Sequence, residues 1–458
     1  MNAASTSDSI TLRQRRLAML ALMCASILAS LDTTITNVAL PQIANELHTP
    51  DSTIIWVANA YQIAMISVLL PLASLGDSIG YRRVYMSGLV IFLSASLISG
   101  VSNSLEWLLV GRTLQGIGGA AMMSVSTAFI RHIYPIDQLG KGLSLNALVV
   151  AVGFTLGPPV ASAILAASNW HWLFLLNVPI GLVALGLSYR YVPIVKGKQQ
   201  SFEFAAGLLC MGFLGSFVYA FCSLKSGMGD PLTLIAAVSA ILLLIGLLKV
   251  QKNHSAPILA LDLLKIPLLG LSSATSVFAF ITQSLALVSL PFLLQNSLDV
   301  SLVSSGFLLA SWPIAVIGMA IVVTPLSDKV SAGVLCSIGL LLLCLGMISL
   351  AIISKETSHT SIIFRLVVCG IGFCLFQAPN MKSIMSNAPS HRSGGASGVI
   401  AISRLMGQTL GAAVVAQCFY FWHQQGAVLA LWLGALTAAL ATVFSVLRVF
   451  VPKHALTK

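Results

Sequence analysis

The feature that most constrains this chain is a series of apolar segments, each of about 20 residues or more, that recurs along its whole length. A helix of about 20 apolar residues is long enough to cross the ~30 Å hydrocarbon core of a bilayer. Only 8% of the 458 residues are charged, whereas soluble domains carry about 25%. The short alternating segments that a transmembrane β-barrel needs are absent. The sequence therefore predicts an all-α polytopic membrane protein.

About fourteen membrane spans are predicted when the length of a membrane helix is used as the ruler. The predicted spans cover residues 17–45, 53–75, 84–101, 107–130, 142–166, 172–192, 203–223, 231–249, 267–296, 302–325, 332–353, 361–385, 394–421 and 426–450.

The loop charges indicate how these spans are oriented. With the N-terminus inside the cell, nearly all loop lysines and arginines, Arg448 among them, lie on the cytoplasmic side, and only Lys225 and Lys355 lie opposite. This asymmetry is the positive-inside pattern of membrane proteins. It places both termini in the cytoplasm. It also accounts for the formal charge of +11 without a nucleic-acid partner.

Two long basic linkers, residues 192–202 and 250–267, divide the chain. They predict a cytoplasmic N-terminal tail, a six-helix bundle, linkers with two inserted helices, a second six-helix bundle and a cytoplasmic C-terminal tail. The boundaries of these five parts are 1–16, 17–192, 193–266, 267–450 and 451–458. A weak repeat between residues 75–80 and 326–331, each after the second helix of a bundle, supports two related halves. Repeated halves are typical of secondary transporters, whose substrate site lies between them.

Asp32 is the one carboxylate deep inside a predicted span. A charged carboxylate at the bilayer centre costs several kcal/mol, and such residues are functional by default. One interpretation is a proton-binding group, because removal from water favours the neutral form of an acid. The other is a structural acid that is permanently paired or hydrogen-bonded. We favour proton binding, with Thr36 on the same helical face as a polar neighbour.

Several motifs resemble one family. They are Leu31–Pro41 around Asp32, Trp56 with Tyr61, Gly76–Arg83, Gly111–Gly119, Gly153 with Gly157 and Pro158, and Gly394–Gly398 before Arg404. Together they resemble the fourteen-helix drug–proton antiporters of the major facilitator superfamily, over nearly the whole chain. The sequence departs from the family pattern at Ala73, at Ser78 and after Pro158.

The resemblance implies a proton-coupling role for Asp32 and Arg112. A guanidinium stays protonated, so Arg112 can compete with a proton or with cargo for Asp32. The alternative for Arg112 is an arginine that reaches the outer headgroups. The resemblance also implies a conformational switch at Gly76, Asp77, Gly80, Arg82 and Arg83, and the internal repeat adds Asp328 to it. For Arg82 and Arg83 a role as positive-inside anchors is an equal alternative, which we favour for Arg83. The resemblance further implies a close-packed hinge at Gly153, Gly157 and Pro158.

Polar or aromatic residues inside the spans are candidates for the substrate cavity. They are Thr36, Trp56, Tyr61, Gln115, Gln283, Gln377, Asn380, Arg404 and Gln408. For Trp56 a place in the aromatic belt is an equal alternative, and for Arg404 a role in helix packing.

Enzyme signatures such as a phosphate loop or a zinc-spaced histidine pair are missing. The eight cysteines fall in or beside apolar runs, and we interpret them as small hydrophobic residues. We expect no cofactor and no metal, with the proton gradient as energy source. The expected function is a monomeric antiporter, in the inner membrane of a bacterium, that exports small amphipathic or hydrophobic compounds in exchange for protons. The bilayer, a small-molecule substrate and protons are its expected partners. The alternatives are a dedicated exporter of one metabolite or lipid and, less favoured, a receptor or scaffold that transports nothing.

Overall fold

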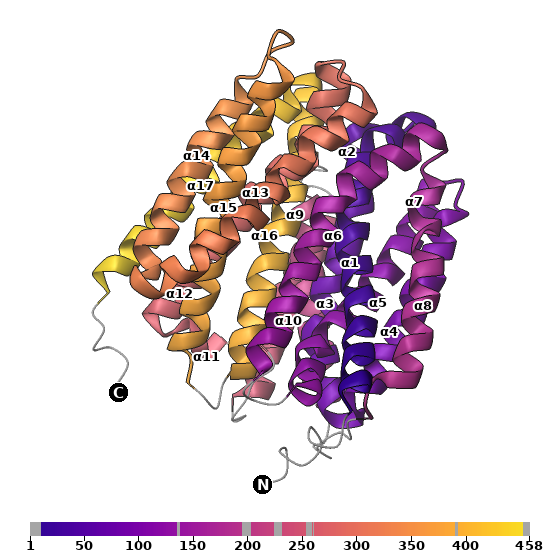
Figure 1. Ribbon diagram of the computed structural model, residues 1–458, viewed down its shortest axis with the longest axis vertical. Coiled ribbons are helices and arrows are strands. Elements are labelled where there is room, and N and C mark those ends of the chain that lie inside the picture. Colours follow the sequence, from indigo (N-terminus) through magenta and orange to yellow (C-terminus); the bar gives the residue numbers. More distant parts are fainter. Residues whose placement is uncertain are drawn as a thin grey trace. The chain divides into compact units, whose positions relative to one another are not determined.

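The computed structural model describes residues 11–134, 138–194, 203–223, 231–252, 259, 261–389 and 393–451. These residues form helices joined by turns and short loops (Figure 1). The helices are α1 (Leu12–Glu46), α2 (Asp51–Ile54), α3 (Trp56–Ile79), α4 (Tyr81–Gly100), α5 (Leu105–Ile133), α6 (Leu139–Ala167), α7 (His171–Leu175), α8 (Asn177–Tyr191), α9 (Phe204–Cys222), α10 (Pro231–Gln251), α11 (Leu261–Leu264), α12 (Pro267–Phe292), the π-helix η2 (Leu293–Ser297), α13 (Leu302–Lys329), α14 (Ala332–Ala351), α15 (His359–Asn387), α16 (Ser393–Trp422), η4 (His423–Gln425), α17 (Gly426–Leu447) and η5 (Arg448–Phe450).

Every predicted span coincides with a helix or with a consecutive pair of helices. Within the described residues, 13 helical segments are long and apolar enough to cross a membrane. The predicted span that is not among them is α5, a helix of 29 residues whose polar side chains include Glu106, Arg112 and Gln115. The predicted all-helical polytopic fold is confirmed.

The chain divides into two compact units, each described by itself below. Unit 1 comprises residues 1–43 and 56–215, and unit 2 comprises residues 44–55 and 216–458. The divisions fall near the end of α1, before α3 and inside α9. The predicted bundle boundaries, 17–192 and 267–450, follow the linkers instead and stay predictions.

In unit 1, α5 packs against both α4 and α3. Glycines let these helices approach closely: a Cβ at Gly118 would lie 2.7 Å from the carbonyl oxygen of Gly88, on α4. A Cβ at Gly116 would lie 2.3 Å from the carbonyl oxygen of Tyr61, on α3. Small residues at such contacts are a common feature of membrane helix packing.

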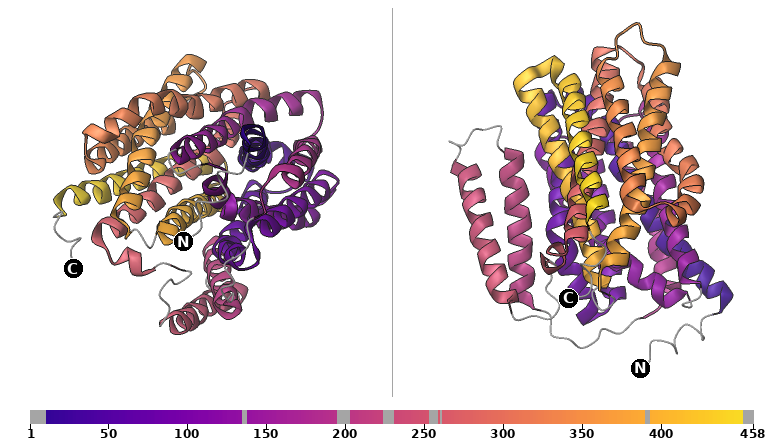
Figure 2. Two further views of the ribbon diagram at one scale, coloured as in Figure 1. Left: turned by 60° about the horizontal axis from the view of Figure 1, so that its bottom comes forward. Right: turned by 90° about the vertical axis from the view of Figure 1, so that its left-hand side faces the viewer.

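Unit 2 repeats this pattern with α15 packed against α14 and α13, and α14 and α15, drawn in orange, lie side by side in Figure 2. A Cβ at Gly372 would lie 2.5 Å from the carbonyl oxygen of Gly339, on α14. A Cβ at Gly370 would lie 2.4 Å from the carbonyl oxygen of Trp312, on α13. Helices α3, α4 and α5 of unit 1 therefore have α13, α14 and α15 of unit 2 as structural counterparts. This agreement supports the weak repeat in the sequence.

Candidate functional site

The most polar buried site in unit 1 is centred on Asp32 of α1. Its Oδ2 forms an ion pair of 2.6 Å with Arg112 Nη1, from α5. Its Oδ1 accepts hydrogen bonds from Gln115 Nε2 at 3.2 Å and from Asn177 Nδ2, on α8, at 2.8 Å. Each of these four side chains is at most 1% exposed. One carboxylate therefore joins three helices in a place shielded from solvent.

Arg112 has further partners besides the carboxylate. Its Nε donates to the backbone oxygen of Val57 at 3.1 Å, and its Nη1 donates to Gln115 Oε1 at 2.8 Å. The guanidinium carbon lies 4.5 Å from the centroid of the Tyr61 ring and 5.7 Å from that of Phe174. Cation–π contacts of this kind strengthen when they are removed from water. The charge is thus held in place by several groups at once.

Local sequence explains how these side chains meet. Arg112 and Gln115 are three residues apart on α5 and share one helical face. Asn177 begins α8, directly after the break that separates α7 from α8. Pro179 has no N–H to donate to the carbonyl of Leu175, and the helix is interrupted at that point. Sequence reasoning missed Asn177, although a polar residue two positions before a proline inside a span was the available signal.

Both carboxylate oxygens of Asp32 already have donors: Arg112 at Oδ2, and Gln115 and Asn177 at Oδ1. A proton on either oxygen would compete with a donor that is already there. Protonation of Asp32 must therefore change the contacts that join α1 to α5 and α8.

The predicted hinge residues lie against α1 beside this site. A Cβ at Gly153 would lie 2.9 Å from Ser30 Cβ, and a Cβ at Gly157 would lie 1.8 Å from Thr34 Oγ1. Helix α6 continues without interruption through Pro158 and the following proline. The contact brings α6 next to the turn of α1 that carries Asp32.

Two predicted cavity residues of unit 1 have other surroundings. The Thr36 hydroxyl donates to the backbone oxygen of Asp32 at 2.8 Å, so it bonds the helix and not the carboxylate. Trp56 is half-buried at the start of α3.

The predicted switch residues lie around the turn between α3 and α4. Tyr81 donates a hydrogen bond of 2.5 Å to Asp77. Gly80 has φ of 99°, a conformation that favours glycine. Arg82 donates to the backbone oxygen of Tyr189, on α8.

The other predicted switch residues are Gly76, Arg83 and Asp328. Gly76 is buried, and Arg83 is exposed. The side chain of Asp328 lies outside the described residues.

In unit 2, Asn380 lies at a second buried polar site. Its Nδ2 donates to Ser276 Oγ at 2.7 Å and to the backbone oxygen of Ser272 at 3.1 Å, and its Oδ1 accepts from Arg448. Arg448 is 5% exposed and also donates to the hydroxyls of Ser272 and Ser445. The sequence analysis grouped Arg448 with the cytoplasmic loop charges, whereas its side chain is buried.

The four remaining predicted cavity residues of unit 2 are all half-buried: Gln283, Gln377, Arg404 and Gln408. They come from three helices, α12, α15 and α16, and Arg404 has interactions of its own. The assignment of a substrate cavity to these residues stays a prediction.

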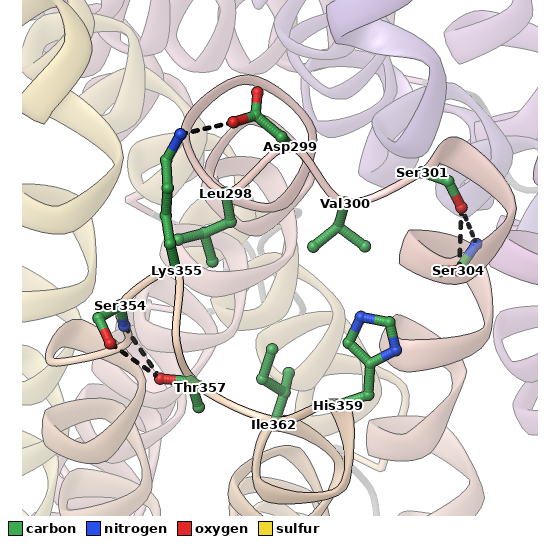
Figure 3. Close-up of a pocket in the computed structure, with 10 residues that line it drawn as sticks. All are labelled: Leu298, Asp299, Val300, Ser301, Ser304, Ser354, Lys355, Thr357, His359 and Ile362. Atoms are coloured by element: carbon green, nitrogen blue, oxygen red, sulfur yellow. Dashed lines mark hydrogen bonds and ion pairs between the residues drawn. The ribbon is translucent and has the colours of Figure 1, made fainter.

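Figure 3 shows a surface pocket of unit 2, with a volume of about 300 Å³, between the loop after η2 and the loop before α15. An exposed ion pair between Lys355 and Asp299 lies at its edge. None of the predicted site residues lines this pocket.

Comparison with known proteins identifies the family. The family model described as the Major Facilitator Superfamily matches residues 22–412. The chain is 42% identical to the uncharacterized transporter YebQ of Escherichia coli, over 98% of both chains. It is 26% identical to the riboflavin transporter RibZ of Clostridioides difficile, over 89% of both chains. It is 28% identical to the multidrug resistance protein Stp of Mycobacterium tuberculosis, over 88% of this chain and 74% of that one.

Among solved structures, a bacterial homologue of the human lysosomal transporter Spinster has a TM-score of 0.67 at 15% identity, over 96% of this chain and 98% of that one. At this identity the likeness shows the fold alone. With the matching family model it leads to one conclusion: the chain belongs to the major facilitator superfamily and is a multi-pass secondary transporter, not an enzyme.

Proposed function

We propose that this transporter exchanges protons for small amphipathic or hydrophobic compounds and exports them from the cytoplasm. The observation that carries the proposal is the ion pair between Asp32 and Arg112, which is 2.6 Å long and 1% exposed at both side chains. Ionisable side chains inside a membrane are rare, pair with one another, and mark substrate or ion pathways and proton relays.

The proposed cycle begins with Asp32 ionised and bound to Arg112, Gln115 and Asn177. A proton that enters from outside neutralises Asp32 and weakens its contacts to α5 and α8. Cargo binding from inside then favours release of the proton. Proton and cargo bias the exchange between two conformations only through their different affinities for each.

The proposal extends to the parts around this site. Gly153, Gly157 and Pro158 form a close-packed contact that resists leakage, and the turn with Asp77 and Arg82 acts as the conformational switch. We place the protein in the cytoplasmic membrane of a bacterium as a monomer, with both termini in the cytoplasm. The bacterial origin of the relatives supports this location.

Two lines of support bear on the cargo. The name of the relative Stp denotes multidrug resistance, and this favours export of several unrelated compounds. The name of RibZ denotes a riboflavin transporter, and this favours the alternative of one dedicated metabolite.

The test is transport in proteoliposomes driven by an imposed pH gradient, with several unrelated dyes and with riboflavin as probes. We expect wild-type protein to move dyes and Asp32→Asn to lose gradient-driven transport. Glu106→Gln is the matched control, since Glu106 is an exposed acid of the same unit. If Asp32→Asn kept full gradient-driven transport and its pH dependence, the assignment of Asp32 would be wrong. Movement of riboflavin alone would favour the dedicated transporter.

A further inference from the structure

Asn177 differs from the other partners of Asp32 in one respect. Its side-chain nitrogen donates to Asp32 Oδ1 at 2.8 Å, but its buried side-chain oxygen has no hydrogen-bond partner among the residues that the structure describes. A buried acceptor that is left unpaired is costly, and in native proteins it calls for an explanation.

Gln115 also carries an amide, but both its oxygen and its nitrogen have hydrogen-bond partners. Its Oε1 accepts from Arg112, and its Nε2 donates both to Asp32 and to Ser96 Oγ. Rotation of this amide by half a turn would break all three bonds. Rotation of the Asn177 amide would exchange only one bond.

The two protonation states of Asp32 need opposite partners. An ionised carboxylate only accepts hydrogen bonds, whereas a protonated one carries an O–H that must donate to an acceptor. The oxygen of Asn177 is attached to the same amide carbon as the nitrogen that now faces Asp32. Half a turn about the last side-chain bond would bring this oxygen to the position of the nitrogen.

We propose that Asn177 is a positioning residue that serves both states of Asp32: its amide donates to the carboxylate and, after rotation, accepts from the protonated acid. This inference rests on the proposed function, since it requires Asp32 to take up a proton. Among the described residues in contact with the site, Arg112 is the one other charged group, and Tyr61, whose ring packs on Arg112, is the one other titratable group. Helices α4 and α8 contribute only the uncharged Ser96 and Asn177.

The test is infrared difference spectroscopy of the purified transporter in lipid between high and low pH. The C=O band of protonated Asp32 is identified by its absence in Asp32→Asn. The variant is Asn177→Leu, which keeps the volume of the side chain, and Asn177→Ala is the second variant in case the first is not obtained folded. Gln115→Leu is the matched control, because it removes a donor from the same carboxylate oxygen.

In Asn177→Leu the O–H of the protonated acid loses its acceptor, and we expect the C=O band to move to higher wavenumber. Both states of Asp32 lose one bond, so the midpoint of proton uptake stays nearly unchanged. In Gln115→Leu the ionised carboxylate loses a donor that stabilises its charge, while the protonated acid keeps Asn177 as the acceptor for its O–H. We therefore expect its midpoint to rise by about one pH unit, a tenfold change in proton affinity, with little change in the band.

An unmoved band in Asn177→Leu, with a midpoint that rises as in Gln115→Leu, would show that Asn177 is only a donor and would overturn the inference. Absence of the acid band in wild-type protein would instead overturn the proposed function, and the inference with it.

Discussion

The two units share a packing pattern but differ in what they bury. Thr34 of α1 packs against Gly157, and Ser284 of α12 likewise packs against Gly411: in both cases a Cβ added to the glycine would clash with the hydroxyl-bearing side chain. Two residues before these contacts lie Asp32 in unit 1 and Thr282 in unit 2.

Each of these two residues forms a hydrogen bond with a later helix of its own unit: α8 in unit 1 and α17 in unit 2. Asn177 of α8 donates to Asp32, whereas Thr437 of α17 shares a hydrogen bond of 2.8 Å with Thr282. Close helix contacts are therefore needed in both halves, while an ionisable centre at this position occurs only in unit 1.

The buried arginines extend the contrast. Arg112 is paired with a carboxylate, whereas the described partners of Arg448 are the side chains of Ser272, Asn380 and Ser445 and the thiol of Cys336. Arg112 has a carboxylate as a partner, which can take up a proton, whereas no carboxylate is among the described partners of Arg448. We infer that unit 1 responds to protons and that Arg448 has a structural role.

The largest expected loss of stability comes from breaking the ion pair between Asp32 and Arg112. Arg112→Met leaves Asp32 buried without its cation, and we expect a loss of about 3–5 kcal/mol in the free energy of unfolding. Arg448→Met leaves only neutral acceptors unpaired, at a cost of about 1–3 kcal/mol. Denaturant titration of both variants in detergent micelles measures the difference. Addition of Asp32→Asn to Arg112→Met is expected to recover most of the stability, and equal losses in the two single variants would break the comparison.

An intermediate loss of stability, equal in both units, is expected when glycines at the close helix contacts are replaced by alanine. Gly118→Ala and Gly372→Ala place a methyl group 2.7 Å and 2.5 Å from backbone oxygen atoms that cannot rotate away. We expect each to cost about 1–3 kcal/mol. Gly186 and Gly318 are the matched controls, because no atom lies within 4 Å of an added Cβ, and alanine there is expected to gain up to about 1 kcal/mol. Thermal unfolding of the four variants checks this, and a large loss in one unit alone would contradict the shared pattern.

The smallest effect is expected at the uncharged counterpart of Asp32. Thr282→Val removes the hydrogen bond to Thr437 and leaves no charge, so we expect a loss of about 0.5–1.5 kcal/mol. The pH dependence of transport is expected to stay as in wild type, measured in the same liposome assay as Asp32→Asn. A shifted pH profile would mean that unit 2 also takes part in proton coupling.

Much of this organisation is visible in the sequence because the bilayer imposes a simple rule on helix length. The spans follow from the apolar runs, and the repeat follows from the similar residues at 75–80 and 326–331. The cost of a buried charge singles out Asp32 as a candidate site. The pairing of Asp32 with Arg112 agrees with the resemblance, although its role in coupling is a proposal.

Other features depend on contacts between distant parts of the chain. Asn177 looked like an ordinary polar residue until the break before α8 placed it next to Asp32. Arg448 lies at the end of a span, where an arginine usually faces the cytoplasm, and only the folded bundle places it against Asn380. Thr36 shares a face with Asp32, but its hydroxyl bonds to the nearer backbone oxygen instead of the carboxylate.

Under the proposed proton coupling at Asp32, the single buried acid has a consequence for how membrane voltage acts on transport. Among the described residues, Asp32 is the only acidic side chain that is fully buried, and one carboxylate carries at most one proton. Exchange of one proton for a neutral compound moves one net charge across the membrane, and a potential of 100 mV then contributes about 2.3 kcal/mol. Exchange for a monocation moves no net charge. Voltage would therefore drive the export of neutral cargo, whereas the export of cations would depend on the pH difference alone.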